Sequence, residues 1–207
     1  MKKLMMGICL GCIGFICLFV CGCATSPEVT KIKGAWKYDK YSGGYIDQVL
    51  IVGKPRISEN RIQFEDYLAK MLAKRKIETI PSHTVIPDMN DLTRENVKRA
   101  AEAAGVKTVL ATIVVGVDDK EVLVRQSQQM EYVYTPNGMY MRPYLDGPKV
   151  VNFKKVRLES GLFEVASEKL IWAAESAIMN PESADEAIKD FSKAIIQQLI
   201  QDGYIRP

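Results

Sequence analysis

Three short stretches of the sequence hold residue types that could carry chemistry. Ser82 and His83 are a nucleophile and a base next to each other, but neighbouring side chains on a strand leave opposite faces, so we expect no catalytic pair there. Asp118-Asp119 could contribute to a metal site, although a turn that ends a strand accounts for the pair more simply. The single histidine excludes multi-histidine metal sites. We therefore expect no enzyme, no catalytic residue, no cofactor and no metal.

The third stretch, Gly53-Lys54-Pro55-Arg56, follows a predicted strand and precedes a predicted helix. Phosphate-binding loops occupy that position in many proteins. This stretch has one glycine, and Pro55 removes a backbone donor, so it matches neither the dinucleotide fingerprint nor the P-loop. A basic turn is the simpler interpretation, and an anion site is the alternative.

The composition is that of a folded protein. Of the 207 residues, 47% are hydrophobic and 26% are charged, which excludes an intrinsically disordered chain. Lysine and arginine number 28 against 25 aspartates and glutamates, so the net charge is only +3. Because nucleic-acid binding needs a strong basic surplus, we expect no nucleic-acid partner.

The start of the chain predicts export and a lipid anchor. Lys2 and Lys3 precede an uncharged apolar run over residues 4–20, which is the pattern of a secretory signal peptide. Val20-Cys21-Gly22-Cys23 resembles the lipobox of bacterial lipoproteins, in which the final cysteine receives the lipid. We expect a signal peptide over 1–22 and lipidation of Cys23. The alternative is an uncleaved membrane helix over 4–23, which is just long enough to span a bilayer.

The cysteine positions agree with this interpretation. All five cysteines lie at or before position 23, so the mature chain would have no disulfide once Cys23 is acylated. By resemblance to lipoproteins, Ala24 in place of aspartate favours the outer membrane. We therefore expect a protein bound to the membrane through Cys23, with its domain facing the periplasm.

Residues 23–45 are expected to form a lipidated tether, and 46–207 a single α/β domain. Val49-Leu50-Ile51-Val52 predicts a strand that is buried on both faces. Thr93 caps a second helix, and Ser183 with Glu186 has the spacing of a capping box. The expected strands are 49–52, 78–86, 109–117, 156–162 and 170–175, and the expected helices are 58–76, 93–105 and 180–203.

The order of these elements predicts the fold class. Strand–helix–strand–helix–strand at the start indicates parallel components, and the alternation after residue 156 indicates strands with one wet face. We expect a mixed sheet of about five strands with three main helices, in which the late strands form an antiparallel hairpin. Trp172 is expected to point inward, beside Phe191 and Ile195 of the last helix.

The segment 126–148 fits none of these patterns and is predicted to be an inserted loop. It holds four of the nine tyrosines, three of the nine methionines and three prolines. Tyrosine and methionine are enriched at protein interfaces, so we expect a partner-contacting surface. The tyrosines of this predicted surface are Tyr132, Tyr134, Tyr140 and Tyr144. The alternatives are a long connection packed on its own domain, or a hairpin that faces the membrane.

The lipobox, the strand at 49–52, Gly105-Val106-Lys107-Thr108-Val109-Leu110 and the late Leu170-Ile171-Trp172-Ala173-Ala174-Glu175 stretch together resemble a family. It comprises bacterial envelope lipoproteins of unassigned function, whose domain is similar to the TolB amino-terminal domain and to the periplasmic domain of the curli-secretion lipoprotein CsgG. The resemblance covers roughly residues 46–205 and brings no catalytic residues.

The resemblance implies a non-catalytic binding or assembly component of the envelope, with an envelope protein as partner. One alternative is a subunit of an oligomeric secretion channel, and another is an envelope hydrolase. A pore-forming hairpin should alternate apolar and polar residues over about 9–11 positions per strand. Pro136, Pro143 and Pro148 interrupt the segment where such a hairpin would lie, which argues against a pore.

Overall fold

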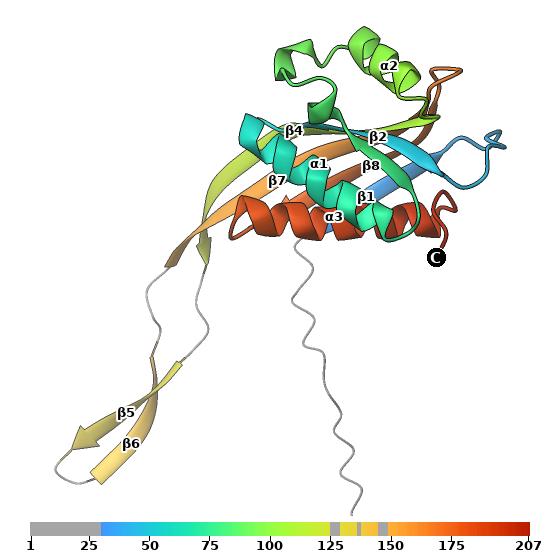
Figure 1. The fold of residues 1–207 in the computed structure, drawn as a ribbon. Coiled ribbons are helices and arrows are strands. Elements are labelled where there is room, and N and C mark those ends of the chain that lie inside the picture. Colours follow the sequence, from blue (N-terminus) through green and yellow to red (C-terminus); the bar gives the residue numbers. More distant parts are fainter. Residues whose placement is uncertain (1–29, 125–128, 136–137, 145–148) are drawn as a thin grey trace, which may run out of the picture.

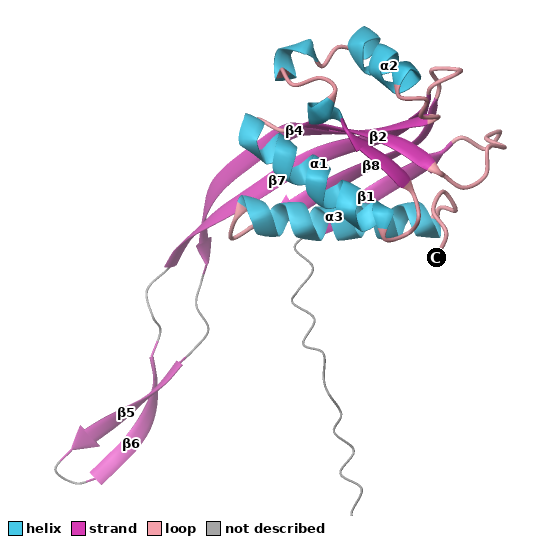
Figure 2. Ribbon diagram, viewed as in Figure 1, coloured by secondary structure: helices cyan, strands magenta, loops and turns pink. Residues whose placement is uncertain are grey.

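The computed structural model describes residues 30–124, 129–135, 138–144 and 149–207. The signal peptide expected over 1–22 and the lipidation site Cys23 lie outside these residues. The described chain forms a six-stranded sheet, three α-helices, two short 3₁₀ helices and a separate two-stranded ribbon (Figures 1 and 2). The expected mixed α/β class is thereby confirmed.

The main sheet has the order β1-β8-β7-β4-β2-β3. Strand β2 lies parallel to β3 and β4, whereas β4–β7, β7–β8 and β8–β1 are antiparallel. The late strands thus form the expected antiparallel hairpin. The strands are β1 (Thr30–Lys37), β2 (Gln48–Lys54), β3 (Glu78–Pro81), β4 (Thr108–Val124), β7 (Lys149–Glu164) and β8 (Leu170–Met179).

Helices cover the sheet unequally. Helices α1 (Ser58–Ala73) and α3 (Ala184–Gln201) lie side by side on one face (Figure 1) and enclose the larger hydrophobic core. Helix α2 (Arg94–Ala103) packs on the other face over a smaller cluster. Strand β2 supplies alternate residues to both clusters, so its apolar run is buried on both sides, as its sequence predicts.

Several local signals are confirmed. Thr93 accepts a hydrogen bond from the Asn96 amide and caps α2. Ser183 caps α3 by accepting from the Glu186 amide. Trp172 is fully buried in the same cluster as Phe191 and Ile195, as expected. Helix α1 has Ile57 as its N-cap, without a side-chain hydrogen bond, and Ser58 is its first helical residue.

Residues 30–37, which the sequence places in the tether, form the edge strand β1 instead. Strand β1 pairs antiparallel with β8 from Thr30↔Ile178 to Lys37↔Trp172. The lysines at 31, 33 and 37 suggest a solvated stalk, but lysines are also typical of exposed edge strands, where they discourage pairing with other chains. This strand is the sixth of the sheet, beyond the five expected.

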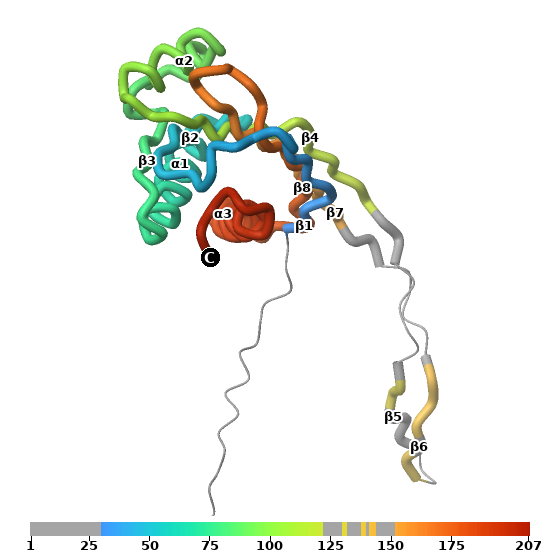
Figure 3. The backbone as a smooth tube through the Cα atoms, turned by 90° about the vertical axis from the view of Figure 1, so that its right-hand side faces the viewer, coloured from blue at the N-terminus to red at the C-terminus, as the bar shows by residue number. Residues whose placement is uncertain are grey.

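The segment predicted as an irregular insert contains two strands. Strands β5 (Gln129–Thr135) and β6 (Gly138–Tyr144) pair antiparallel as a two-stranded ribbon. The long strands β4 and β7, which pair as far as Val124↔Lys149, lead towards this ribbon and form an arm (Figure 3). Prolines and short runs obscured the strand pattern in the sequence.

The arm leaves the sheet on the side where β8 ends and β1 begins, and we call this side of the domain the arm end. One row across the sheet joins Thr30, Ile178, Val156 and Val117 through their registers, and β4 continues past this row. Strand β2 ends nearby at Lys54, which pairs with Ile113. The start of β1 therefore lies at the arm end. Helices α1 and α3 also begin there, after β2 and β8.

Candidate functional site

Ser82 and His83 both contact the carboxylate of Glu65. The Ser82 hydroxyl donates to Glu65 Oε1 at 2.6 Å, and Ser82 is fully buried. The His83 ring lies between two carboxylates, with Nδ1 2.9 Å from Glu65 Oε2 and Nε2 3.4 Å from Asp66 Oδ1. The strand predicted over 78–86 ends at Pro81, and Ser82 and His83 lie in a short 3₁₀ helix, Ser82–Thr84. Their side chains therefore reach the same carboxylate, and the prediction that they leave opposite faces of a strand is wrong.

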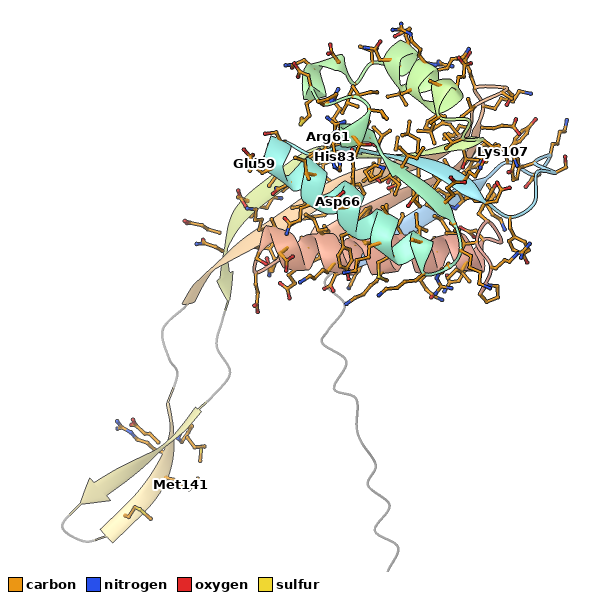
Figure 4. All side chains as sticks on the ribbon, viewed as in Figure 1. Glu59, Arg61, Asp66, His83, Lys107 and Met141 are labelled. Carbon is orange, nitrogen blue, oxygen red and sulfur yellow. The ribbon has the colours of Figure 1, made fainter. Side chains whose placement is uncertain are left out.

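Glu65 is the centre of a buried polar network. Its Oε1 accepts from the Gly53 amide at 2.8 Å and from Arg61 Nε at 3.1 Å, and its Oε2 accepts from the His83 amide at 2.7 Å. Arg61 also donates to the Ile86 carbonyl at 2.7 Å. Arg61, Asp66 and His83 lie together between α1 and the segment after β3 (Figure 4). The network fastens α1 to β2 and to the segment 82–87.

The two adjacent aspartates lie inside a strand and not at a turn. Asp118 and Asp119 pair with Lys155 and Lys154 in the β4–β7 register, and Asp118 forms an ion pair with Arg157 at 3.3 Å. The turn expected from sequence is therefore wrong, because β4 continues into the arm. In the part of the chain that the structure describes, no three histidine, cysteine, aspartate or glutamate side chains gather as metal ligands would.

The stretch 53–56 lines a cavity at the arm end. The cavity has a volume of about 470 Å³ and lies between β4, β7 and the first turns of α1 and α3. Its inner wall includes Phe64, Val114, Leu158 and Phe191, and its rim includes charged side chains. The basic turn that the sequence singled out thus faces an apolar hollow. We call it the arm-end cavity.

The ribbon exposes methionines on one face. Met139 and Met141 are alternate residues of β6, and Met130 pairs with Pro143, the next alternate residue. Side chains of directly paired and alternate residues share a face. Met130, Met139 and Met141 are 55%, 57% and 50% exposed, and Figure 4 labels Met141 far from the helices. These three residues are the methionine face.

An ion pair lies on the opposite face of the ribbon. Glu131 pairs with Arg142 in the register, and their side chains form an ion pair. The backbone of Tyr132 pairs with Met141, and that of Tyr134 with Met139. The side chains of Tyr132, Tyr134, Tyr140 and Tyr144, predicted from sequence to contact a partner, lie outside the described part of the structure.

The methionine face, the Glu65 network and the arm-end cavity are not among the features that the sequence predicts. For the first, a signal existed: Met130, Tyr132 and Tyr134 alternate, and Asn137-Gly138 lies between the two runs, which is a pattern typical of hairpins. For the other two, the contacts join residues far apart in the chain. Among the described residues, none of the helices has the length and apolar character that crossing a membrane requires.

Comparisons with known proteins find distant likenesses of fold. No family model matches the chain, and no curated protein matches it. A PelC dodecamer from Paraburkholderia phytofirmans is 10% identical, with a TM-score of 0.44 over 86% of this chain and 99% of that one. Lipoprotein GNA1162 from Neisseria meningitidis is 11% identical, with a TM-score of 0.40 over 74% and 98%.

A third solved structure is a putative neuraminyllactose-binding hemagglutinin homolog from Helicobacter pylori. It is 14% identical, with a TM-score of 0.40 over 78% of this chain and 88% of that one. At these identities and TM-scores, the three structures resemble the chain distantly and assign no function to it.

Proposed function

We propose that this protein is a lipid-anchored component of the bacterial envelope, held in the outer membrane with its domain in the periplasm. It acts as a non-catalytic binding or assembly component, and the ribbon is the surface that contacts an envelope protein. The observation that carries the proposal is the methionine face, in which three side chains at least half exposed lie together on a two-stranded ribbon.

An isolated two-stranded ribbon is at best marginally stable in water. A partner that covers the apolar face would supply the burial that the ribbon lacks. Methionine suits such a contact because its flexible thioether adapts to irregular surfaces, and methionine and tyrosine are enriched in interface cores. The Glu131–Arg142 ion pair lies on the opposite face, so a partner that covers the methionine face does not bury that pair.

The composition of the ribbon favours a protein partner over a lipid surface. Amphipathic helices that lie in a membrane interface carry several lysines or arginines, with tryptophan, phenylalanine or leucine on the apolar face. Residues 129–144 hold one basic residue, Arg142, and no tryptophan, phenylalanine or leucine. That arginine is already paired with Glu131.

The position of the arm fits an anchored protein. Seven residue steps separate Cys23 from Thr30, which span at most about 25 Å when fully extended. Thr30 lies in the row from which the arm extends. A lipid on Cys23 would therefore hold the arm end near the membrane, and the partner would be a protein at that membrane's periplasmic surface.

We also propose that the domain is similar to the TolB amino-terminal domain and to the periplasmic domain of CsgG. The other candidate occupant of the methionine face is a second copy of the chain, as in a subunit of a secretion-channel-like assembly. Analytical ultracentrifugation of lipid-free protein separates the two cases. A monomer supports a different protein as partner, whereas a large closed assembly would overturn that choice.

The decisive variant replaces 126–148 with an Asn-Gly turn. Because Val124 and Lys149 already pair, Arg125-Asn-Gly closes the arm as a three-residue loop with glycine last, which is a common hairpin connection. We expect the melting temperature to change by less than about 2–4 °C, equivalent to about 1 kcal/mol in a domain of this size. We expect the proteins recovered by crosslinking in cells to be lost.

A second variant keeps the ribbon and changes only the methionine face. Met130, Met139 and Met141 are each replaced by serine, and replacement of the exposed Ile62 on α1 by serine is the matched control. We expect loss of the crosslinked partner in the first and its retention in the second. Unchanged crosslinks with a lowered melting temperature would show that the segment stabilises its own domain, and would overturn the proposal.

A further inference from the structure

The arm-end cavity has apolar walls and a basic rim. Three cations line it: Lys54 at the end of β2, Arg56 in the following loop and Lys154 on β7. All three residues are exposed, and among the described residues none of their side chains has an ion-pair partner. Glu182 is the acidic residue on the same rim. The rim therefore has a surplus of positive charge facing an apolar hollow.

The first turn of α1 adds to the positive rim. Ile57 and Asn60 line the cavity. The N-cap Ile57 offers no side-chain acceptor to the amides of that turn, although the Asn60 amide donates to the Ile57 carbonyl. The start of α3 differs, because Ser183 and Glu186 satisfy amides there. Free amides and the helix dipole favour an anion at such a position.

The inside of the cavity is suited to hydrocarbon. Val114, Val156, Leu158, Ile188 and Phe191 come from two strands and one helix and line it together. The volume of about 470 Å³ falls within the range of small-molecule sites, about 300–1,000 Å³. An inorganic anion would leave the apolar walls exposed to water. An uncharged ligand would make no ion pair with the three cations.

We propose that the arm-end cavity binds an anionic amphiphile with a single buried acyl chain. The chain lies against the apolar walls, and the carboxylate or phosphate of the head group lies at the rim beside Lys54, Arg56 and Lys154. A free fatty acid and a lysophospholipid share this chemistry, and each would present one acyl chain and one anionic group. The site is separate from the methionine face, and its occupancy does not depend on the partner of the ribbon.

The test uses the full lipidated protein in phosphatidylcholine vesicles and a photoactivatable sixteen-carbon fatty acid. Mass spectrometry then locates the labelled peptides. We expect label on the cavity-lining stretches of β4, β7, α1 or α3, with competition by hexadecanoate, by lysophosphatidylglycerol or by both. Competition by only one of them identifies the head group as carboxylate or phosphate, and either result supports the proposal.

The charge variant replaces Lys54, Arg56 and Lys154 with glutamine. Each basic residue near an anionic group is worth up to about fivefold in affinity, so labelling should fall by more than about tenfold. The matched control replaces Lys33, Lys70 and Lys74, which do not line the cavity, with glutamine and should label normally. A filling variant, Ala187→Phe, keeps the charges and should also lose label. Thermal melting checks that each variant is folded.

Three outcomes would overturn the proposal. Equal labelling by the corresponding photoactivatable alcohol would show that the cations do not select the ligand. Full competition by inorganic phosphate alone would indicate a simple anion site. Label that stays unchanged in both the charge variant and the filling variant, or label confined to peptides outside the cavity, would place the amphiphile elsewhere.

Discussion

Arg61→Met is expected to destabilise the domain strongly, because Arg61 is the cation of a buried network. Its side chain donates to Glu65 Oε1 at 3.1 Å, to the Ser82 hydroxyl at 3.0 Å and to the Ile86 carbonyl at 2.7 Å. Both Arg61 and Glu65 are buried. Methionine matches the arginine side chain only as far as Nε, so the substitution removes the donors and the charge and leaves the space of the outer guanidinium group empty.

The magnitude follows from what remains after the substitution. Removing one partner of a buried ion pair costs about 3–5 kcal/mol, because the other charge stays buried and uncompensated. Glu65 keeps the amides of Gly53 and His83 and the Ser82 hydroxyl, which limits the loss. The Ile86 carbonyl loses its donor, which adds to the loss of stability. We expect a loss of about 4 kcal/mol, or about 8–16 °C in melting temperature for a domain of this size.

Urea unfolding followed by circular dichroism measures this loss on the lipid-free protein. The control is Arg94→Met, which removes an exposed arginine paired with Glu168 and should cost less than about 1 kcal/mol. The double variant Arg61→Met/Glu65→Met should lose less than the sum of the two single variants, because no charge is left buried. A change below about 1 kcal/mol for Arg61→Met would refute the structural role of the network.

Two further predictions concern the anchor and the core. Cys23→Ser should abolish membrane association and leave an unprocessed precursor; fractionation and immunoblotting measure both, and a mutant still cleaved and membrane-bound would contradict the lipobox interpretation. Trp172→Ala should cost about 3–5 kcal/mol in unfolding free energy, because the buried indole also donates to Asp202 Oδ2 at 2.7 Å. With Trp36 replaced by phenylalanine, the fluorescence maximum of Trp172 should be that of a buried indole, and a solvent-exposed maximum would contradict its placement.

The parts of the fold that the sequence predicts are those set by neighbouring residues. Val49-Leu50-Ile51-Val52 is apolar at every position, as a strand buried on both faces requires, and β2 is such a strand. Thr93 and Ser183 lie within one turn of the amides that they cap. Gly105 adopts a positive φ of 69° directly after α2, as its position past the helix end predicts.

The parts that the sequence does not predict depend on contacts between distant segments. Arg61 and Glu65 are spaced as an ordinary surface pair on a helix, and they are buried only because the segment 82–87 covers them. The arm-end cavity likewise combines residues from β2, β4, β7, α1 and α3. Strand β1 was missed because its lysines match both a stalk and a protected edge strand.

Crosslinking in living cells from two adjacent positions of β6 tests the proposed function most directly. A photoreactive amino acid at position 141 replaces Met141 on the methionine face, and one at position 142 replaces Arg142, which pairs with Glu131 on the opposite face. We predict a crosslinked envelope protein from position 141 and little or none from position 142. Equal protein crosslinks from both positions, lipid adducts alone from position 141, or no crosslink from either would contradict the proposed function.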